Sequence, residues 1–233
     1  MIRGIFVLFL LAGLWGCANR TTNNTTTSDT PVTVPAPTPV SLEDTHDGLS
    51  KAVFASGCFW CTEAVFERVA GVKDVVSGYA GGSATDATYK KVAAGLTDHA
   101  EAVIVKYDPQ VISYSTLVEV FFASHDPTQV NRQGPDVGRQ YRSEIFYATD
   151  EEREIAQRYK SELDGSGKYS RPIATNLSKL ETFYPAEDYH QNYYELNPNQ
   201  SYVYNVSRPK VEKFMKEYPQ LLKPKYRKQV EKG

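Results

Sequence analysis

The chain has 233 residues, a formal net charge of −2 and a hydrophobic fraction of 41%. Its length suffices for one domain around a single core, and its balanced charge gives no indication of nucleic-acid binding. No internal repeat is evident.

Residues 1–17 have the pattern of a targeting segment. Arg3 is their only charged residue, and the apolar run from Ile5 to Leu14 is shorter than the ~20 residues of a membrane-spanning helix. The stretch Leu14-Trp15-Gly16-Cys17 resembles a bacterial lipoprotein signal, in which the cysteine is lipidated. We expect lipidation of Cys17, because a long polar segment follows it; an ordinary signal peptide with an incidental cysteine is the alternative.

Residues 18–48 are rich in Thr, Asn and Pro and contain almost no large apolar side chain. Such a segment buries too little surface to offset the entropy lost on ordering, so it predicts a disordered tether. The tether would join a lipid anchor, on the periplasmic side of a bacterial membrane, to a domain over residues 49–218. Ala18 is not an acidic retention-type residue, which favours the outer membrane. A disordered N-terminus that does not act as a tether fits the composition equally well. Residues 219–233 are expected to form a solvated basic tail.

Within the domain, strand-like apolar runs alternate with helical periodicity. Strands are predicted over residues 52–55, 72–76, 99–107 and 143–148, with a partly extended stretch over 173–183. Helices are predicted over residues 88–94, 115–125, 150–165 (with Asp150 as N-cap) and 211–218, and another helical pattern begins after residue 58. A long polar loop over 126–141 and short hairpin-like links interrupt the alternation. The pattern favours an α+β two-layer sandwich with a mixed sheet.

The segment Gly57-Cys58-Phe59-Trp60-Cys61 lies between the first strand and this helical pattern. Cys58 is therefore expected at or near a helix N-terminus, where unpaired N–H groups and the helix dipole favour a thiolate, the reactive form of cysteine. Phe59 and Trp60 can wall an apolar pocket beside its sulfur. Cys61 follows about one helical turn later, and a bridge across so short a loop would add little stability. The pair therefore indicates redox chemistry.

Glu101 is the best candidate for an acid or base, because it lies within an otherwise apolar strand. On a core-facing position its charged form is disfavoured, so its pKa rises and it can hold a proton near neutral pH. Strand alternation leaves open whether the side chain faces the core or solvent.

Three tyrosines in or beside polar loops, Tyr79, Tyr89 and Tyr141, are further candidates. A phenol can donate a hydrogen bond to a substrate oxygen, although in a chain with 16 tyrosines any one is more often a packing residue. Asp136 is either an orienting carboxylate or a turn former.

Two other kinds of site use some of the same residue types. Cys-x-x-Cys supplies two ligands where a closed zinc site needs four, and the histidines are scattered, so no metal site is expected. A thioredoxin-like oxidoreductase also uses Cys-x-x-Cys at a helix N-terminus, but Phe59 and Trp60 stand where Gly and Pro would be.

Several separate motifs together resemble those of the A-type peptide methionine sulfoxide reductases. In chain order they are Gly57-Cys58-Phe59-Trp60, Gly78-Tyr79-Ala80-Gly81-Gly82, Thr88-Tyr89, His99-Ala100-Glu101-Ala102-Val103, Tyr107-Asp108-Pro109, the stretch 121–127, the stretch 136–143 and the stretch 183–191. The resemblance covers residues 50–215 and implies a ferredoxin-like core with an extended C-terminal coil.

The resemblance also implies a role for each matched residue. Cys58 would be the nucleophile, and Glu101 the acid that protonates the sulfoxide oxygen. Phe59 and Trp60 would hold the S-methyl group of the substrate, the S epimer of methionine sulfoxide. The residues expected to hydrogen-bond around the oxygen are Tyr89, Tyr141 and Asp136. No cofactor is implied, because electrons come from a thioredoxin-like dithiol or another thiol.

One departure from the family pattern concerns recycling. Many members carry a resolving cysteine near the C-terminal end, where this chain has Val203. Cys61 is therefore expected to resolve the sulfenic acid on Cys58, with an external thiol, or a merely structural Cys61, as alternatives. We expect a monomer that repairs oxidised exported proteins. A dithiol exchanger and a non-catalytic module that binds methionine-containing peptides remain alternative functions.

Overall fold

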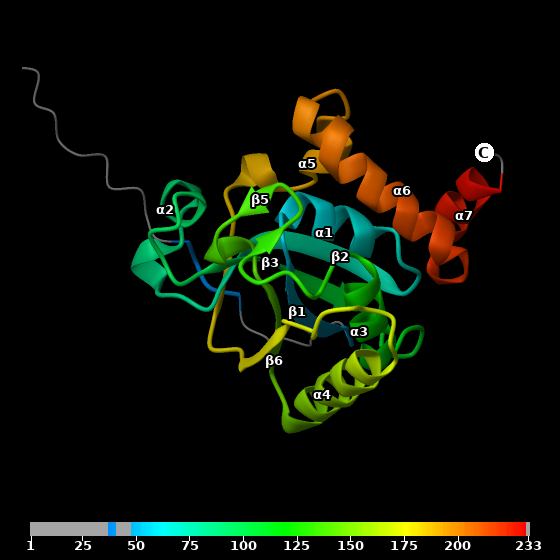
Figure 1. Cartoon of the computed structure of the whole chain (residues 1–233). Helices are drawn as coiled ribbons and strands as arrows, with labels where there is room; N and C mark the ends of the chain where they lie inside the picture. The colour runs from blue at the N-terminus through cyan, green and yellow to red at the C-terminus, as the bar shows by residue number, and fades with distance from the viewer. Residues whose placement is uncertain (1–36, 41–47, 232–233) are drawn as a thin grey trace, which may run out of the picture. The chain divides into compact units, whose positions relative to one another are not determined.

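The computed structural model describes residues 37–40 and 48–231 (Figure 1). The predicted targeting segment, Cys17 and most of the predicted tether lie outside the described residues. Within the part of the chain that the structure describes, no helix is both long and apolar enough to cross a membrane.

Six strands form one sheet in the order β7-β6-β1-β3-β2-β8. Neighbouring strands are antiparallel except β6 and β7, which are parallel, so the predicted mixed sheet is confirmed. The strands are β1 (Ser50–Ser56), β2 (Val72–Ala80), β3 (Ala100–Tyr107), β6 (Ser143–Tyr147), β7 (Asn176–Lys179) and β8 (Phe183–Pro185). A separate two-stranded hairpin consists of β4 (Arg132–Gln133) and β5 (Asp136–Val137).

Helices cover one face of this sheet, and α1 lies across it in Figure 1. The α-helices are α1 (Phe59–Glu67), α2 (Tyr89–Ala93), α3 (Tyr114–Ala123), α4 (Asp150–Gly165), α5 (Tyr193–Leu196), α6 (Arg208–Glu217) and α7 (Pro224–Val230). Shorter turns are η1 (Ala84–Asp86), η2 (Arg139–Tyr141), η3 (Asp188–His190), η5 (Pro219–Leu221) and the π-helical η4 (Val203–Ser207). Because α6 packs against α1, the chain after η4 contacts the helix that begins at Cys58.

The two faces of the sheet carry cores of different size. On the helix side, the Phe54 ring stacks on Phe66 of α1 at 5.1 Å and on Phe121 of α3 at 5.5 Å between centroids. On the other side, a smaller cluster contains Val53 and Phe146. Since both faces are buried, the central strands have almost continuous apolar runs in the sequence.

Several element boundaries differ from the sequence predictions. Thr149, and not Asp150, caps α4, because its hydroxyl accepts a hydrogen bond from the Glu152 amide at 3.2 Å. The predicted polar loop over 126–141 contains the β4–β5 hairpin, and the extended stretch over 173–183 divides into β7 and the start of β8. These strands, of two to four residues each, are too short to give a clear alternating pattern.

Both ends of the domain contain contacts that the sequence did not predict. Val40, in the segment predicted as a tether, donates its backbone N–H to the Phe183 carbonyl at 3.1 Å. In the expected basic tail, α7 begins at Pro224, and the Arg68 guanidinium lies 4.8 Å from the Tyr226 ring centroid. Over its described residues, the tail therefore contains a helix that packs against the C-terminal end of α1 through a cation–π contact.

Candidate active site

The turn between β1 and α1 presents Cys58 at the start of the helix. Gly57 has φ +95°, and a Cβ there would lie 2.5 Å from the Cβ of Gln133, so only glycine fits between the turn and β4. Cys58 is the N-cap residue of α1, and its carbonyl accepts hydrogen bonds from the Cys61 and Thr62 amides. The predicted placement at a helix N-terminus is confirmed.

Glu101 faces the helix layer beside this turn. It lies on the same face of β3 as Val103, which belongs to the helix-side core, and only 2% of its surface is exposed. The amide of Phe59, the first residue of α1, donates a hydrogen bond to Glu101 Oε2 at 3.1 Å. Burial raises the pKa of Glu101 to about 8, against the lowering effect of this hydrogen bond. The carboxyl therefore holds a proton at neutral pH, and it is hydrogen-bonded to the residue that directly follows Cys58.

A cavity of about 290 Å³ opens over Cys58 and Glu101. The side chains that line it are those of Cys58, Phe59, Trp60, Tyr89, Glu101, Asp136, Tyr141, Gln200 and Tyr202. The structure thus brings together every residue that the sequence assigned to the nucleophile, acid and substrate pocket. These residues come from α1, α2, β3, β5 and η2, which lie far apart in the sequence.

Sequence reasoning missed two lining residues, Gln200 and Tyr202. The Tyr202 hydroxyl donates a hydrogen bond to Asp136 Oδ2, which joins the segment before η4 to β5. Burial raises the pKa of the Cys58 thiol, and its interaction with Tyr202 acts in the opposite direction. In the sequence, Gln200 and Tyr202 stand just before Val203, the position at which many family members carry a resolving cysteine. That nearness to a functional position is the feature that could have indicated them.

Aromatic side chains form one wall of the cavity. Trp60 stacks on Tyr193 of α5 at 3.8 Å between ring centroids, and its Nε1–H donates to His190 Nδ1 at 3.2 Å. Phe59 stacks on Tyr89 at 6.5 Å. His190 is a third residue that the sequence did not point out, since it holds the Trp60 ring without lining the cavity. The wall is therefore a packed apolar surface with defined ring orientations.

Tyr79 does not line the cavity. Its hydroxyl donates to Glu187 Oε2 at 2.8 Å, and the other oxygen of that carboxylate accepts from the Tyr89 amide at 3.0 Å. Tyr79 and Glu187 therefore position the start of α2, which carries Tyr89.

The two cysteine side chains are both buried, and each shifts the pKa of the other. Burial raises the pKa of Cys58, and the neighbouring Cys61 raises it further. The hydrogen bond from Cys58 lowers the pKa of Cys61 to about 7, with a further contribution from the charge of Lys210. In the resting site, burial thus acts on the Cys58 thiol in the direction opposite to the helix N-terminus.

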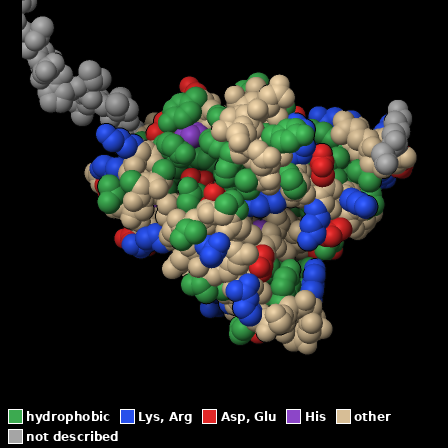
Figure 2. All heavy atoms as spheres, turned by 45° about the horizontal axis from the view of Figure 1, so that its top comes forward, with side chains coloured by type: hydrophobic (Ala, Val, Ile, Leu, Met, Phe, Trp, Pro, Cys, Tyr) green, Lys and Arg blue, Asp and Glu red, His purple; other side chains and the backbone are tan. Residues whose placement is uncertain are grey.

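Exposed apolar side chains surround the mouth of the site. Figure 2 shows hydrophobic side chains gathered around a small acidic group on the face that is turned forward. Exposed large hydrophobic residues on elements next to the cavity are Val137, Tyr189, Leu196 and Tyr204. Such a rim suits a polypeptide substrate better than a small polar one.

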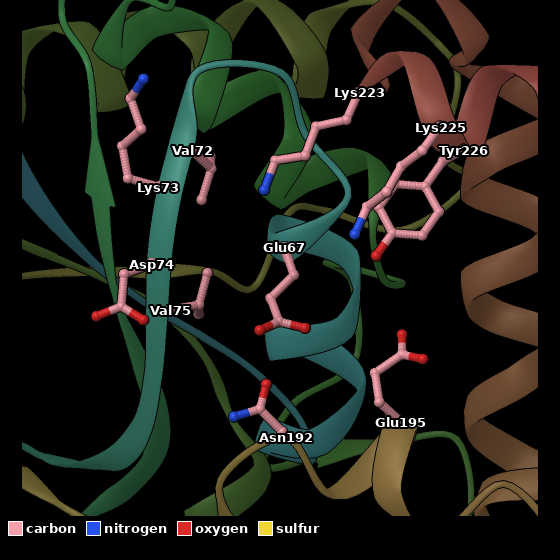
Figure 3. A pocket seen from close by; sticks show the side chains of 10 residues that line it. All are labelled: Glu67, Val72, Lys73, Asp74, Val75, Asn192, Glu195, Lys223, Lys225 and Tyr226. Carbon is pink, nitrogen blue, oxygen red and sulfur yellow. The ribbon is translucent and has the colours of Figure 1, made fainter.

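Another cavity of about 300 Å³ lies at the opposite end of α1. Glu67 and Lys223 point into it in Figure 3, and both Glu195 and Lys225 contribute to its walls. It contains no cysteine, and its charges are of both signs. Among the described residues, no group of three or more His, Cys, Asp or Glu side chains is arranged to hold a metal ion.

The fold and the site define a class of protein. A cysteine at a helix N-terminus, a second cysteine three residues later and a buried carboxyl that holds a proton at neutral pH are typical of a thiol-dependent oxidoreductase acting on an oxygen-bearing substrate.

Comparisons with known proteins give the family. The family model described as peptide methionine sulfoxide reductase matches residues 50–222. Peptide methionine sulfoxide reductase MsrA 2 of Synechocystis is 50% identical over 79% of this chain and 86% of its own length. The chain therefore belongs to the peptide methionine sulfoxide reductase family, and it is an enzyme that reduces methionine sulfoxide to methionine. The A-type resemblance predicted from the motifs is confirmed.

Solved structures agree with the α+β fold. Mxr1 from Saccharomyces cerevisiae in reduced form is 37% identical with a TM-score of 0.59, and the match covers 66% of this chain and 88% of that one. Methionine sulfoxide reductase A of Corynebacterium diphtheriae is 37% identical with a TM-score of 0.57, over 65% and 76% of the two chains.

Proposed function

We propose that this enzyme reduces the S epimer of methionine sulfoxide, free or in proteins, with Cys58 as nucleophile and Glu101 as general acid. The observation that carries the proposal is the hydrogen bond from the Phe59 amide to Glu101 Oε2, which holds a buried carboxyl beside Cys58. A sulfoxide oxygen leaves sulfur readily only when it is protonated, so an acid at this position supplies what the reaction needs.

The reaction reduces the sulfoxide sulfur and oxidises the Cys58 sulfur by two electrons. Cys58 loses its proton and its sulfur bonds to the sulfoxide sulfur, while Glu101 gives a proton to the oxygen, which leaves the methionine sulfur as water when a second proton arrives. A water oxygen then bonds to the Cys58 sulfur as the S–S bond breaks, so methionine leaves, a proton is released and Cys58 becomes a sulfenic acid. Tyr89, Tyr141 and Asp136 line the cavity from its polar side and would hydrogen-bond around the oxygen.

The cavity walls support selection of one epimer. Phe59 and Trp60 form an apolar surface for the S-methyl group, and the tyrosine hydroxyls with Asp136 form a polar surface for the oxygen. When methyl, oxygen and main chain each have a fixed side, only one configuration at sulfur places the sulfur atom against Cys58.

Cys61 is proposed to regenerate Cys58. It attacks the sulfenic sulfur, forming a disulfide and releasing water, and a thioredoxin-like dithiol then reduces the disulfide. The support is the effect of each buried thiol on the pKa of the other, which requires the two sulfurs to be close, together with Val203 standing where many family members carry another cysteine. Because electrons come from thiols, no cofactor is required.

The N-terminal pattern supports a cellular role in repair. We propose that residues 1–17 direct export, that Cys17 is lipidated, and that residues 18–48 tether a monomeric domain over 49–218 to the periplasmic side of a bacterial membrane, the outer membrane being favoured. The substrates would then be oxidised exported proteins. Incorporation of labelled fatty acid, compared between the natural chain and Cys17→Ser, tests the anchor; equal labelling of both would contradict it.

The catalytic proposal is tested with separated S and R methionine sulfoxide peptides and dithiothreitol. We expect turnover of the S peptide alone, abolished in Cys58→Ser and strongly reduced in Glu101→Gln. Equal turnover of both epimers would refute the selectivity. Reduction of insulin disulfides without any sulfoxide turnover would favour a dithiol exchanger.

A further inference from the structure

Cys61 has a hydroxyl partner that comes from a distant part of the chain. Its thiol donates a hydrogen bond to Ser207 Oγ at 3.2 Å across a sequence separation of 146 residues. Ser207 has 0% of its surface exposed, and Cys61 has 5%. The sulfur of Cys61 therefore has two polar neighbours, the Cys58 thiol and the Ser207 hydroxyl, and all three side chains are buried.

The π-helical turn η4 places this hydroxyl. Val203 and Ser207, at the two ends of the turn, are buried against the domain, while Tyr204 between them is exposed. Ser207 is followed directly by α6, which packs beside α1. Isolated π-helical turns often occur at functional sites, since they shift the side chains that follow out of ordinary α-helical register.

A positive charge lies on the same side. Lys210 follows Ser207 by three residues, about one helical turn, on α6. Its Nζ lies 3.9 Å from the Cβ position of Gly134, and its charge contributes to lowering the pKa of Cys61. Lys213, one turn further along, has 71% of its side chain exposed and forms an ion pair with Glu217 at 3.9 Å.

We propose that Ser207 is a positioning residue for recycling: its hydroxyl orients the Cys61 sulfur and stabilises it as a thiolate for attack on oxidised Cys58, with Lys210 supporting the charge. This inference rests on the proposed role of Cys61 as the resolving cysteine. In many family members the segment around Val203 supplies the resolving cysteine. In this chain the same segment supplies the Ser207 hydroxyl, which is hydrogen-bonded to the Cys61 sulfur on α1.

The chemistry of a hydroxyl fits both states of Cys61. While Cys61 is a thiol, its S–H donates the observed hydrogen bond to Ser207 Oγ. Once Cys61 has lost this proton, the Ser207 hydroxyl can rotate and donate a hydrogen bond to the thiolate. The thiolate forms the S–S bond with Cys58, the S–O bond of the sulfenic acid breaks, and the leaving hydroxide takes a proton from solvent as water. A dithiol then reduces the disulfide and is itself oxidised to a disulfide.

The test follows disulfide formation after one turnover in the full chain without added reductant. Trypsin cleavage after Lys51 and Arg68 yields one peptide with both Cys58 and Cys61, so its mass after alkylation reports their state independently of Cys17. In Ser207→Ala we expect disulfide formation at pH 7 to slow by about two- to sixfold. Loss of the hydrogen bond raises the pKa of Cys61, so a smaller fraction of Cys61 is thiolate. The slowing is limited because a thiolate of higher pKa is a stronger nucleophile. The midpoint of the pH profile of Ser207→Ala should rise by about one to two pH units.

Matched variants distinguish positioning from a general structural effect. Ser201→Ala, which removes an exposed hydroxyl from the preceding segment, should leave the rate and the pH midpoint unchanged. Ser207→Thr, which keeps a hydroxyl, should restore the midpoint. Lys210→Gln should slow disulfide formation in a salt-dependent way, whereas Lys213→Gln, the same charge change on an exposed side chain, should not.

The outcomes separate this inference from the proposed function. An unchanged rate and midpoint in Ser207→Ala, or an equal loss in Ser201→Ala, overturns the role of Ser207. If Ser207→Ala also loses the first sulfoxide reduction, disulfide formation is compared between Lys210→Gln and Lys213→Gln instead. Equal rates of disulfide formation in these two variants overturn the inference. If Cys61→Ser is recycled by a dithiol as fast as the natural enzyme, the resolving role of Cys61 is itself wrong.

Discussion

The two halves of the active site are built in different ways. The chemical half, Cys58, Phe59 and Glu101, lies on α1 and β3, is buried, and is joined by a hydrogen bond from the helix backbone to the carboxyl. The binding half, Asp136, Tyr141, Gln200 and Tyr202, lies on a short hairpin, a 3₁₀ turn and the segment before η4. Its side chains are partly or fully exposed.

The difference suggests a division of labour. Regular elements with a shared core hold reacting groups within the tolerance that bond formation requires. Irregular segments can adjust to a polypeptide that carries the sulfoxide, and their contacts distinguish substrates more than they alter the chemical step. Variants in the chemical half should therefore lower kcat, and variants in the binding half should mainly raise KM.

The largest effect is expected from Cys58→Ser. A serine hydroxyl at the same position is not ionised near neutral pH, so sulfoxide reduction should fall by at least about 10,000-fold. The measurement is single-turnover formation of methionine from an S-sulfoxide peptide. Residual activity within a factor of ten of the natural enzyme would remove Cys58 from the chemical half.

Glu101→Gln should come next, with kcat lowered by about 100- to 10,000-fold and KM changed little. In the natural enzyme the acid is protonated below its pKa of about 8, so the rate should fall as pH rises through 8, and this limb should vanish in the variant. A normal kcat in Glu101→Gln would show that Glu101 is not the general acid.

The same carboxyl makes a prediction for stability. Its pKa is higher in the folded chain than the ordinary value of 4.5, so its protonation favours folding at low pH. As pH rises from about 4.5 to 8, the natural enzyme should lose unfolding free energy relative to Glu101→Gln. Urea unfolding of both proteins at pH 5 and pH 8 measures this, and a constant difference between them would contradict it.

Cys61→Ser should affect recycling more than the first reduction. Cys61 raises the pKa of Cys58, so its removal favours the Cys58 thiolate, and the first turnover should be retained. Steady-state turnover with a thioredoxin-like dithiol should fall by about tenfold or more. Unchanged steady-state turnover with that donor would show that an external thiol acts directly on the sulfenic acid.

The smallest effect is expected in the binding half. Tyr202→Phe removes the hydroxyl that donates to Asp136, and KM should rise by about three- to tenfold with a smaller change in kcat. Tyr204→Phe removes an exposed hydroxyl two residues away and serves as the control. A loss confined to kcat would mean that Tyr202 belongs with the chemical half.

The sequence by itself determined the parts that depend on short-range patterns. The turn before α1, the spacing of Cys58 and Cys61, the strand that carries Glu101 and most helices follow from local periodicity and capping. Boundaries such as Thr149 at the start of α4 were off by one residue, because Thr149 and Asp150 are both good caps and only the hydrogen bond to the Glu152 amide distinguishes them. The family followed from several motifs in one order.

Only the tertiary structure decided which face of β3 meets the helices, and so whether Glu101 is buried. It also brought Tyr202 to Asp136, His190 to Trp60 and Ser207 to Cys61, across separations of 66, 130 and 146 residues. Such contacts depend on how β8, η4 and α6 pack around α1, and no local pattern encodes them. Propensity and periodicity act over a few residues, whereas side-chain partners are chosen when distant elements share one core.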